Sequence, residues 1–365
     1  MSMRKILSRT ANMNLLVTKL CVMALAALPA NAYGGPLFES NNTLSITIVV
    51  PMRQMLRHRS SDQKYDAVLS YTDASGVRHE LNFKLTTRGH SRLEMCKFPP
   101  LRLTFDRDES RSTVLENQHH LKMVTQCESG YRGKNWVSQE FGIYRAYNAI
   151  TDYSYRVRWL EVTFRDTESK RWKKVQRAFL IEPIDDAATR LQRESIRPPE
   201  IRSEQFSLVE TTHNLLFQYL IGNTDFAVKR GPAGEGCCHN GRVLAAPGQH
   251  TEWVVLPYDF DQAGVINTDY ALPYERLPIR RVTTRLYRGF CWQNAVLPQS
   301  IALFNEHRDD IIEALLQPGL GKTTRARELR FIDKFYDVVN DAEKLKEEIL
   351  DKCRGSHVLP DSPTS

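Results

Sequence analysis

Apolar and polar residues alternate along much of the first half of the chain, which is the pattern of half-buried β-strands. Alternating or β-branched segments cover 45–50, 66–71, 77–85, 101–105, 157–164 and 175–181. A Gly-containing turn at 72–76 joins two of them as a hairpin. One helix interrupts the strands, because Val137, Phe141 and Tyr144 recur at helical spacing, with Ser138 as a candidate N-cap.

Helical spacing dominates the second half. The pattern predicts helices over 203–220, 298–316 and 325–352, the first of which ends at Gly222. The Pro-rich segment 193–199 reads as a hinge. We therefore expect an α+β fold of two lobes, a β-rich N-lobe at 33–200 and a mainly helical C-lobe at 201–355, with a disordered tail at 356–365 and a cleft between the lobes.

The first 32 residues have the pattern of a signal peptide. Basic Arg4, Lys5, Arg9 and Lys19 precede or interrupt a short apolar run, and an A-x-A signal ends at Ala32. A retained membrane anchor is the alternative, although Lys19 disfavours it. The pattern predicts export to the periplasm or the extracellular space, with no transmembrane segment after cleavage.

Charge does not indicate a nucleic-acid partner. The formal net charge of +7 falls to +3 once the leader is removed, because the leader carries four basic residues and no acidic one. No basic stripe interleaved with aromatic residues is visible in the sequence.

Six cysteines follow the leader, and an even number in an exported chain favours disulfides. We expect Cys96 to pair with Cys127, and Cys237 or Cys238 to reach Cys291 or Cys353. Zinc at Cys237, Cys238 and His239 is the alternative, although adjacent cysteines do not easily face one tetrahedral ion.

Three aspartates are the best candidates for chemistry. The run VVLPYDFDQAG at 254–264 predicts a strand on which Asp259 and Asp261 share one face. Paired carboxylates repel each other unless a cation lies between them, so this pattern predicts a divalent metal. Asp225 lies in a loop just past the helix that ends at Gly222.

Several segments, in order, resemble the CotH kinase-like family of the spore-coat-protein-H type. RGHS at 88–91 and KFPPLRLTF at 97–105 resemble its RGNS…FPK…YRLKF signature. LKMV at 121–124 and FLIEPID at 179–185 resemble two further segments, and the Asp225 loop and the DFD run complete the series.

The resemblance implies an atypical protein-kinase-like fold that transfers phosphate from ATP, with Mg²⁺ or Mn²⁺, to an acceptor that we expect to be a protein hydroxyl. It assigns the catalytic role to Asp225, and metal binding to Asp259 or Asp261 and to Asn240. Arg88, Lys97 and Lys122 compete for the phosphates, with Glu182 as a candidate ion-pair partner.

Two other functions use the same residues. The chain could be a catalytically inactive kinase-fold binding module of the cell envelope, in which Asp259 and Asp261 hold a structural cation such as Ca²⁺. It could also be a metal-dependent phosphoester hydrolase, which needs the carboxylates but no acceptor protein.

Overall fold

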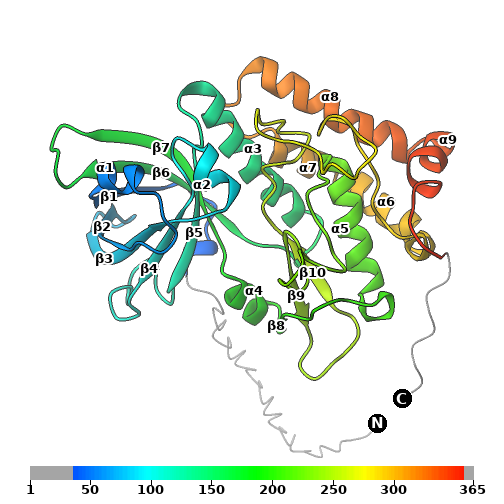
Figure 1. Ribbon diagram of the computed structural model, residues 1–365, viewed down its shortest axis with the longest axis horizontal. Helices are drawn as coiled ribbons and strands as arrows, with labels where there is room; N and C mark the ends of the chain where they lie inside the picture. The colour runs from blue at the N-terminus through cyan, green and yellow to red at the C-terminus, as the bar shows by residue number, and fades with distance from the viewer. Residues whose placement is uncertain (1–35, 357–365) are drawn as a thin grey trace, which may run out of the picture. The chain divides into compact units, whose positions relative to one another are not determined.

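The chain places its strands first and most of its helices second, as the computed structural model shows for residues 36–356, the part of the chain that the structure describes (Figure 1). The strands are β1 (Leu44–Val50), β2 (Tyr65–Thr72), β3 (Arg78–Thr87), β4 (Leu101–Phe105), β5 (His120–Thr125), β6 (Val157–Asp166), β7 (Lys173–Ile181), β8 (Glu194–Ile196), β9 (Gly241–Ala245) and β10 (Val254–Pro257). The helices are α1 (Met52–Arg57), α2 (Ser91–Met95), α3 (Gly130–Asn148), α4 (Ile184–Arg190), α5 (Leu208–Ile221), α6 (Leu297–Glu306), α7 (Arg308–Leu315), α8 (Lys322–Val339) and α9 (Ala342–Leu345). The fold is mixed α+β, with a β-rich N-terminal part and helices in the C-terminal part.

The first seven strands close into a barrel in the order β1-β2-β3-β4-β5-β7-β6. All neighbours are antiparallel except β1 and β6, which run parallel and close the barrel. Alternate residues of each strand point inward, and the interior is a single apolar cluster that includes Ile48, Leu85, Leu103 and Phe164. The strands that the alternation predicts are confirmed, whereas their closure into a barrel was not predicted.

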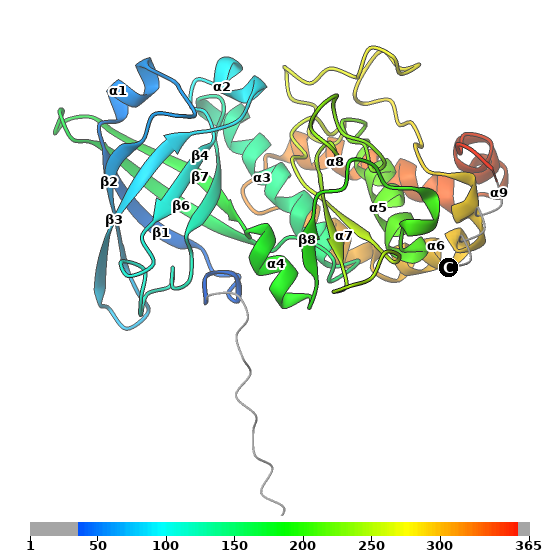
Figure 2. The ribbon, with the colours of Figure 1, turned by 60° about the horizontal axis from the view of Figure 1, so that its bottom comes forward.

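Helix α3 lies between the barrel and the helical part, where it packs against β7 and α7 (Figure 2). It begins at Gly130, so the expectation that Ser138 caps it is wrong. Ser138 lies inside the helix and its Oγ donates to the Lys134 carbonyl at 2.8 Å. The first two turns contain two glycines, and their aromatic residues, Tyr131 and Trp136, are five positions apart rather than at helical spacing, which is why the sequence pattern misses them.

Two long helices expected near the C-terminus are each divided. The segment 298–316 splits into α6 and α7 at His307, and the segment 325–352 splits after Val339. Asp341 begins the next helix there, because its carboxylate accepts the backbone N–H groups of Glu343 and Lys344 at 3.1 and 2.9 Å. An N-cap inside a periodic pattern explains the second break.

Three disulfides connect the described cysteines. Cys96 pairs with Cys127 as expected. The expectation that Cys237 or Cys238 reaches Cys291 or Cys353 is wrong, since Cys237 bonds to Cys238, and Cys291 bonds to Cys353. The Cys237 N–H is held by the Pro198 carbonyl at 2.8 Å, while the Cys291 N–H binds the Arg354 carbonyl at 3.0 Å, so the two pairs are anchored to different segments. Disulfides are typical of proteins that fold in an oxidising compartment.

The predicted leader, residues 1–32, and most of the predicted tail, 357–365, lie outside the described residues. None of the helices between residues 36 and 356 combines the length and the apolarity that a bilayer crossing needs.

Candidate functional site

One buried arginine, Arg92, contacts three carboxylates where the barrel meets the helical part. Arg92, on α2, places Nη1 3.1 Å from Glu140 Oε2 and Nε 3.3 Å from Asp261 Oδ2, and its Nη2 donates to Asp259 Oδ1. The Arg92 and Asp261 side chains are each 10% exposed and Glu140 is 4% exposed, whereas Asp259 is 31% exposed. A guanidinium therefore lies between the two aspartates for which the sequence predicts a metal cation.

Asp259 and Asp261 are not on a strand, so that expectation is wrong. β10 ends at Pro257, and Asp259 adopts a left-handed backbone with φ +64°. Aspartate tolerates this conformation better than most residues. The Asp259 N–H donates to Tyr144 Oη at 3.0 Å, which fixes the bend against α3. The bend, rather than strand alternation, lets both carboxylates reach Arg92.

The surroundings of Asp259 and Asp261 shift the pKa values of the two aspartates in opposite directions. Burial favours the neutral form and raises the pKa of Asp261 to about 8. The positive charge of Arg92 lowers this pKa, whereas the negative charges of Asp259 and Glu140 raise it further. Burial also acts on Asp259, but Arg92, Arg88 and Lys122 outweigh it and lower its pKa. Asp259 is thus the ionised member, and Asp261 tends to hold a proton at neutral pH.

Two further cations act on Asp259 from the barrel. Lys122 on β5 has its pKa lowered to about 7, by burial first and by the neighbouring Arg88 and Arg242 next. Arg88 follows β3, and its Nε is buried with no hydrogen-bond partner among the described residues. Buried cations without partners are costly, and an anion that binds beside them would supply the missing contacts.

Asp225 lies in the loop after α5 and has its own set of partners. His239 Nε2 lies 2.9 Å from its Oδ1, and Asn240 Nδ2 donates to its Oδ2 at 3.0 Å and to its carbonyl at 2.7 Å. The hydrogen bond with Asp225 raises the pKa of His239 above its usual value. Arg288 Nη1 donates to the carbonyls on either side, those of Thr224 and Phe226, at 2.6 Å each. The carboxylate remains 38% exposed within this frame.

Tyr258 joins the Asp225 loop to the acidic cluster. Its N–H donates to the Asn240 carbonyl at 3.1 Å, and the next residue is Asp259. The Tyr258 ring is approached by Lys122 Nζ at 4.8 Å and by the Arg242 guanidinium at 5.1 Å from its centroid. Two sites distant in sequence are therefore connected through one residue.

A cavity of about 230 Å³ opens beside Tyr258 and Lys122. Its other walls come from β4, β5, Tyr155 and the junction of β7 with α4, which includes Ile181, Glu182 and Ile184. Apolar and aromatic side chains share its lining with the basic Arg102 and Lys122 and the acidic Glu182 and Asp185, a combination that can hold a flat ring with polar substituents.

The predicted phosphate-binding residues separate into two groups. Arg88 and Lys122 form one group, because both lower the pKa of Asp259 and Arg88 also lowers that of Lys122. Lys97 is 68% exposed and pairs with Glu128 at 2.8 Å. Glu182 lines the cavity, but its carboxylate pairs with Arg190 at 2.8 Å rather than with any of the three candidate cations.

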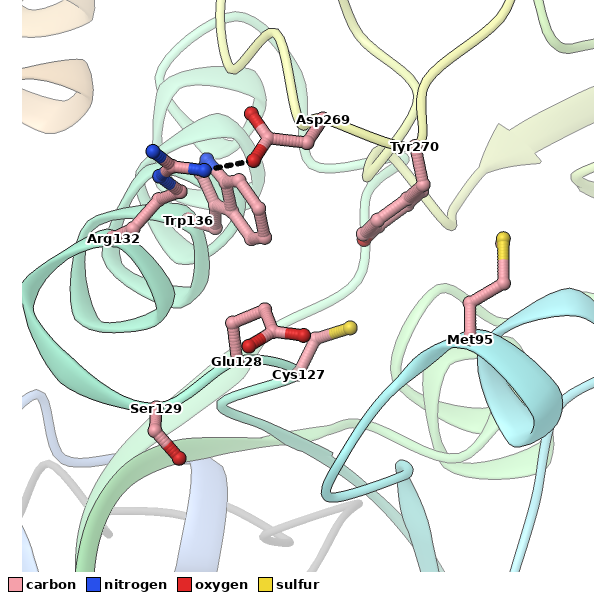
Figure 3. Close-up of a pocket in the computed structure, with 8 residues that line it drawn as sticks. All are labelled: Met95, Cys127, Glu128, Ser129, Arg132, Trp136, Asp269 and Tyr270. Atoms are coloured by element: carbon pink, nitrogen blue, oxygen red, sulfur yellow. Dashed lines mark hydrogen bonds and ion pairs between the residues drawn. The ribbon is translucent and has the colours of Figure 1, made fainter.

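A second cavity, of about 620 Å³, is lined by residues of α3 and of the loop around Tyr270 (Figure 3). Trp136 and Tyr270 meet edge to face in its wall, and Tyr270 also hydrogen-bonds Asp261. Its charged groups are already paired, since Arg132 on α3 bonds Asp269, as the dashed line in Figure 3 shows, and Glu128 bonds Lys97.

The sequence reasoning missed Arg92, Glu140 and Arg288. Glu140 could have been identified from the sequence, because it is a charged residue within the apolar stripe of Val137, Phe141 and Tyr144. A charged residue on a buried helix face requires a buried partner. Arg92 and Arg288 left no comparable signal, since both lie in segments that read as ordinary polar loops.

No protein-family model matches the chain, and no curated protein matches it either.

Proposed function

We propose that the chain is a kinase-like phosphotransferase that binds a nucleoside triphosphate, with ATP as the expected donor, between the barrel and the helical part. The observation that carries this proposal is that Lys122 lines the cavity beside Tyr258 and, together with Arg88, lowers the pKa of the neighbouring Asp259 against the effect of its burial. The cavity takes the base, and the phosphates extend toward Lys122 and Arg88, whose buried Nε has no hydrogen-bond partner among the described residues.

The order of the residues along the chain supports the same function. Protein kinases place a lysine on a strand, a glutamate on the next helix, a loop aspartate and asparagine, and then a metal-binding aspartate. The corresponding order here is Lys122, Glu140, Asp225, Asn240 and Asp259. Glu140 departs from that scheme, because it binds Arg92 and not Lys122.

Asp225 orients the acceptor in this scheme. An acceptor hydroxyl donates to the exposed carboxylate, its oxygen attacks the γ-phosphorus, and the bond from that phosphorus to the bridging oxygen breaks. The nucleoside diphosphate leaves with that electron pair, while Asp225 receives the hydroxyl proton. His239 and Asn240 hold the carboxylate for this contact, and Arg88 and Lys122 balance the phosphate charge.

Asp259 and Asn240 are the residues that would hold a divalent cation in this proposal, although no group of three or more His, Cys, Asp or Glu side chains among the described residues is arranged to hold a metal and Arg92 already satisfies part of the acidic cluster. Glu140 Oε1 is buried without a hydrogen-bond partner among the described residues, and Asp259 is partly open. The Nδ2 of Asn240 donates to Asp225, so Oδ1 is the Asn240 atom that remains to bind a metal ion, and Mg²⁺ prefers oxygen ligands. Asp259 and Asn240 would hold Mg²⁺ or Mn²⁺, which would neutralise charge on the β- and γ-phosphates when bound.

Thermal-shift measurements on the full chain test the nucleotide site. A non-hydrolysable ATP analogue with Mg²⁺ is expected to raise Tm, because a ligand stabilises the state that binds it, by about 2.7 kcal/mol at about 100 times its Kd. Lys122→Met should remove most of this shift. Lys97→Met is the matched control and should keep it, because Lys97 pairs with Glu128 away from the cavity.

The proposal fails if neither metal nor nucleotide, alone or together, moves Tm in the wild-type protein. Equal loss in the Lys97→Met and Lys122→Met proteins would also contradict it, because the effect would then follow total charge and not the site.

A non-catalytic nucleotide-binding module is the second candidate, and Arg92 is the observation that favours it. A guanidinium that bonds Glu140, Asp259 and Asp261 already supplies the cation that the paired acids need. A module of this kind would show the nucleotide-dependent rise in Tm without phosphate transfer to any acceptor.

A further inference from the structure

A long segment without helix or strand passes beside the Asp225 loop. Between β10 and Cys291 the chain forms no regular element, and this segment is drawn in yellow tones in Figures 1 and 2. Loops of this length inside a compact fold are uncommon and are often functional.

The end of this segment is firmly attached. Arg285 donates to the last carbonyls of α5, those of Tyr219 and Leu220, at 3.0 Å each. Arg288 holds the carbonyls that flank Asp225, as described above. Val282 is buried, and its carbonyl oxygen would lie only 2.2 Å from a Cβ on Gly264. The segment is therefore fixed to the frame of the site.

The part before Val282 presents arginines to solvent. Arg276, Arg280 and Arg281, here called the arginine strip, are exposed. Within residues 36–356, none of the three side chains has an ion pair or a hydrogen bond with another described residue. Glu275 is the only acidic residue from 270 to 288, a stretch that contains five arginines.

Two apolar side chains accompany the strip. Leu272 is 77% exposed and Tyr274 is 53% exposed. Arginine and tyrosine are enriched in protein interfaces, and the guanidinium fork matches a carboxylate with two parallel hydrogen bonds. An acidic polypeptide with an occasional apolar residue is the partner that this combination fits.

We propose that the arginine strip binds acidic side chains of the acceptor polypeptide and so directs its hydroxyl group to Asp225. The inference rests on the proposed function, since it names the class of acceptor for the same site. A polypeptide is favoured over an anionic membrane because the segment is fixed through Arg288 to the loop that carries Asp225, where an acceptor chain must pass. In this proposal, the arginine strip determines which polypeptide is the acceptor, and Asp225 takes the proton from the acceptor hydroxyl.

Peptide binding without nucleotide tests the strip separately from catalysis. The probe is a fluorescein-labelled serine peptide flanked by Asp and Glu, and the readout is anisotropy with the full chain. The triple variant Arg276→Gln/Arg280→Gln/Arg281→Gln should weaken Kd about tenfold, as expected for three exposed charge pairs. Raising the salt concentration should weaken wild-type binding and leave the variant less affected.

Arg107→Gln/Arg165→Gln/Arg171→Gln is the matched control. These arginines are also exposed, and their replacement removes the same charge from the barrel side of the molecule. The control should bind the peptide as tightly as the wild type, because it does not touch the strip.

Equal peptide affinity in the strip variant and the wild type would overturn the proposal, as would tighter binding of a lysine-flanked serine peptide. Retention on phosphatidylserine vesicles without peptide binding would also overturn it in favour of a membrane surface. A protein that binds the peptide through the strip but transfers no phosphate would contradict the proposed function. The strip would then remain a binding site for acidic peptides.

Discussion

Asp225→Asn is expected to lower phosphate transfer by about 10²–10⁴-fold, the usual contribution of a group that takes a proton in the transition state. The amide cannot accept the hydroxyl proton, while Asn240 Nδ2 can still donate to the amide oxygen and an unprotonated His239 Nε2 can accept from the amide nitrogen. The nucleotide-dependent rise in Tm should be unchanged, because Asp225 is not placed on the phosphates. Initial rates with an acidic serine peptide and labelled ATP measure the effect.

Two other aspartate variants calibrate that result. Asp259→Asn should lose both turnover and the metal-dependent part of the Tm rise, since Asp259 faces Arg88 and Lys122. Asp269→Asn, which breaks the surface pair with Arg132, should leave both unchanged. Turnover by the Asp225→Asn protein within about threefold of the wild type would remove Asp225 from the mechanism.

Arg92→Met is expected to lower the free energy of unfolding by about 3–5 kcal/mol, because removing one partner of a buried charge network leaves the others uncompensated. Glu140, Asp259 and Asp261 would lose their shared cation. Chemical denaturation at pH 8 measures the loss.

The pH dependence distinguishes lost charge from lost packing. Burial already raises the pKa of Asp261 to about 8 and raises that of Glu140, so the folded state binds protons that the unfolded chain releases. Stability from such groups is present below the unfolded pKa, near 4, and declines as pH rises toward the folded value. Removing Arg92 should steepen that decline, so Arg92→Met should lose less at pH 5 than at pH 8.

The companion variant Arg92→Met/Asp261→Asn should recover part of the loss at pH 8, because it removes one of the stranded carboxyl groups. An unfolding free energy for Arg92→Met equal to that of the wild type at pH 8 would show that the guanidinium does not hold the cluster together.

Local patterns predicted the barrel strands and the hairpin across 72–76, because alternation and a turn glycine are features of consecutive residues. The segment 101–105 became β4 with the same bounds, and Gly222 ended α5 in a left-handed conformation. Closure of the barrel depends on the parallel contact of β1 with β6, which are separated by more than a hundred residues, and no local pattern encodes that contact.

In the candidate site, too, the sequence predicted local features but not the contacts between distant segments. Asp225, Asn240 and Asp259, which residue type and motif singled out as candidates, lie in one connected region. The cation between Asp259 and Asp261 was expected to be a metal, whereas the described structure places Arg92 there. Sequence showed that paired acids need a positive charge, but it could not show which element would deliver one, because α2 is distant from them in sequence.

The most direct test of the proposed function is a crystal structure of the full chain with a non-hydrolysable ATP analogue and Mn²⁺, with the ion located by its anomalous signal. We expect one Mn²⁺ peak bonded to Asp259, phosphates in contact with Lys122 and Arg88, and the base in the cavity beside Tyr258. An ion bound elsewhere, for instance between Glu128 and Asp269 in the cavity of Figure 3, or a nucleotide that leaves Lys122 untouched, would contradict the account.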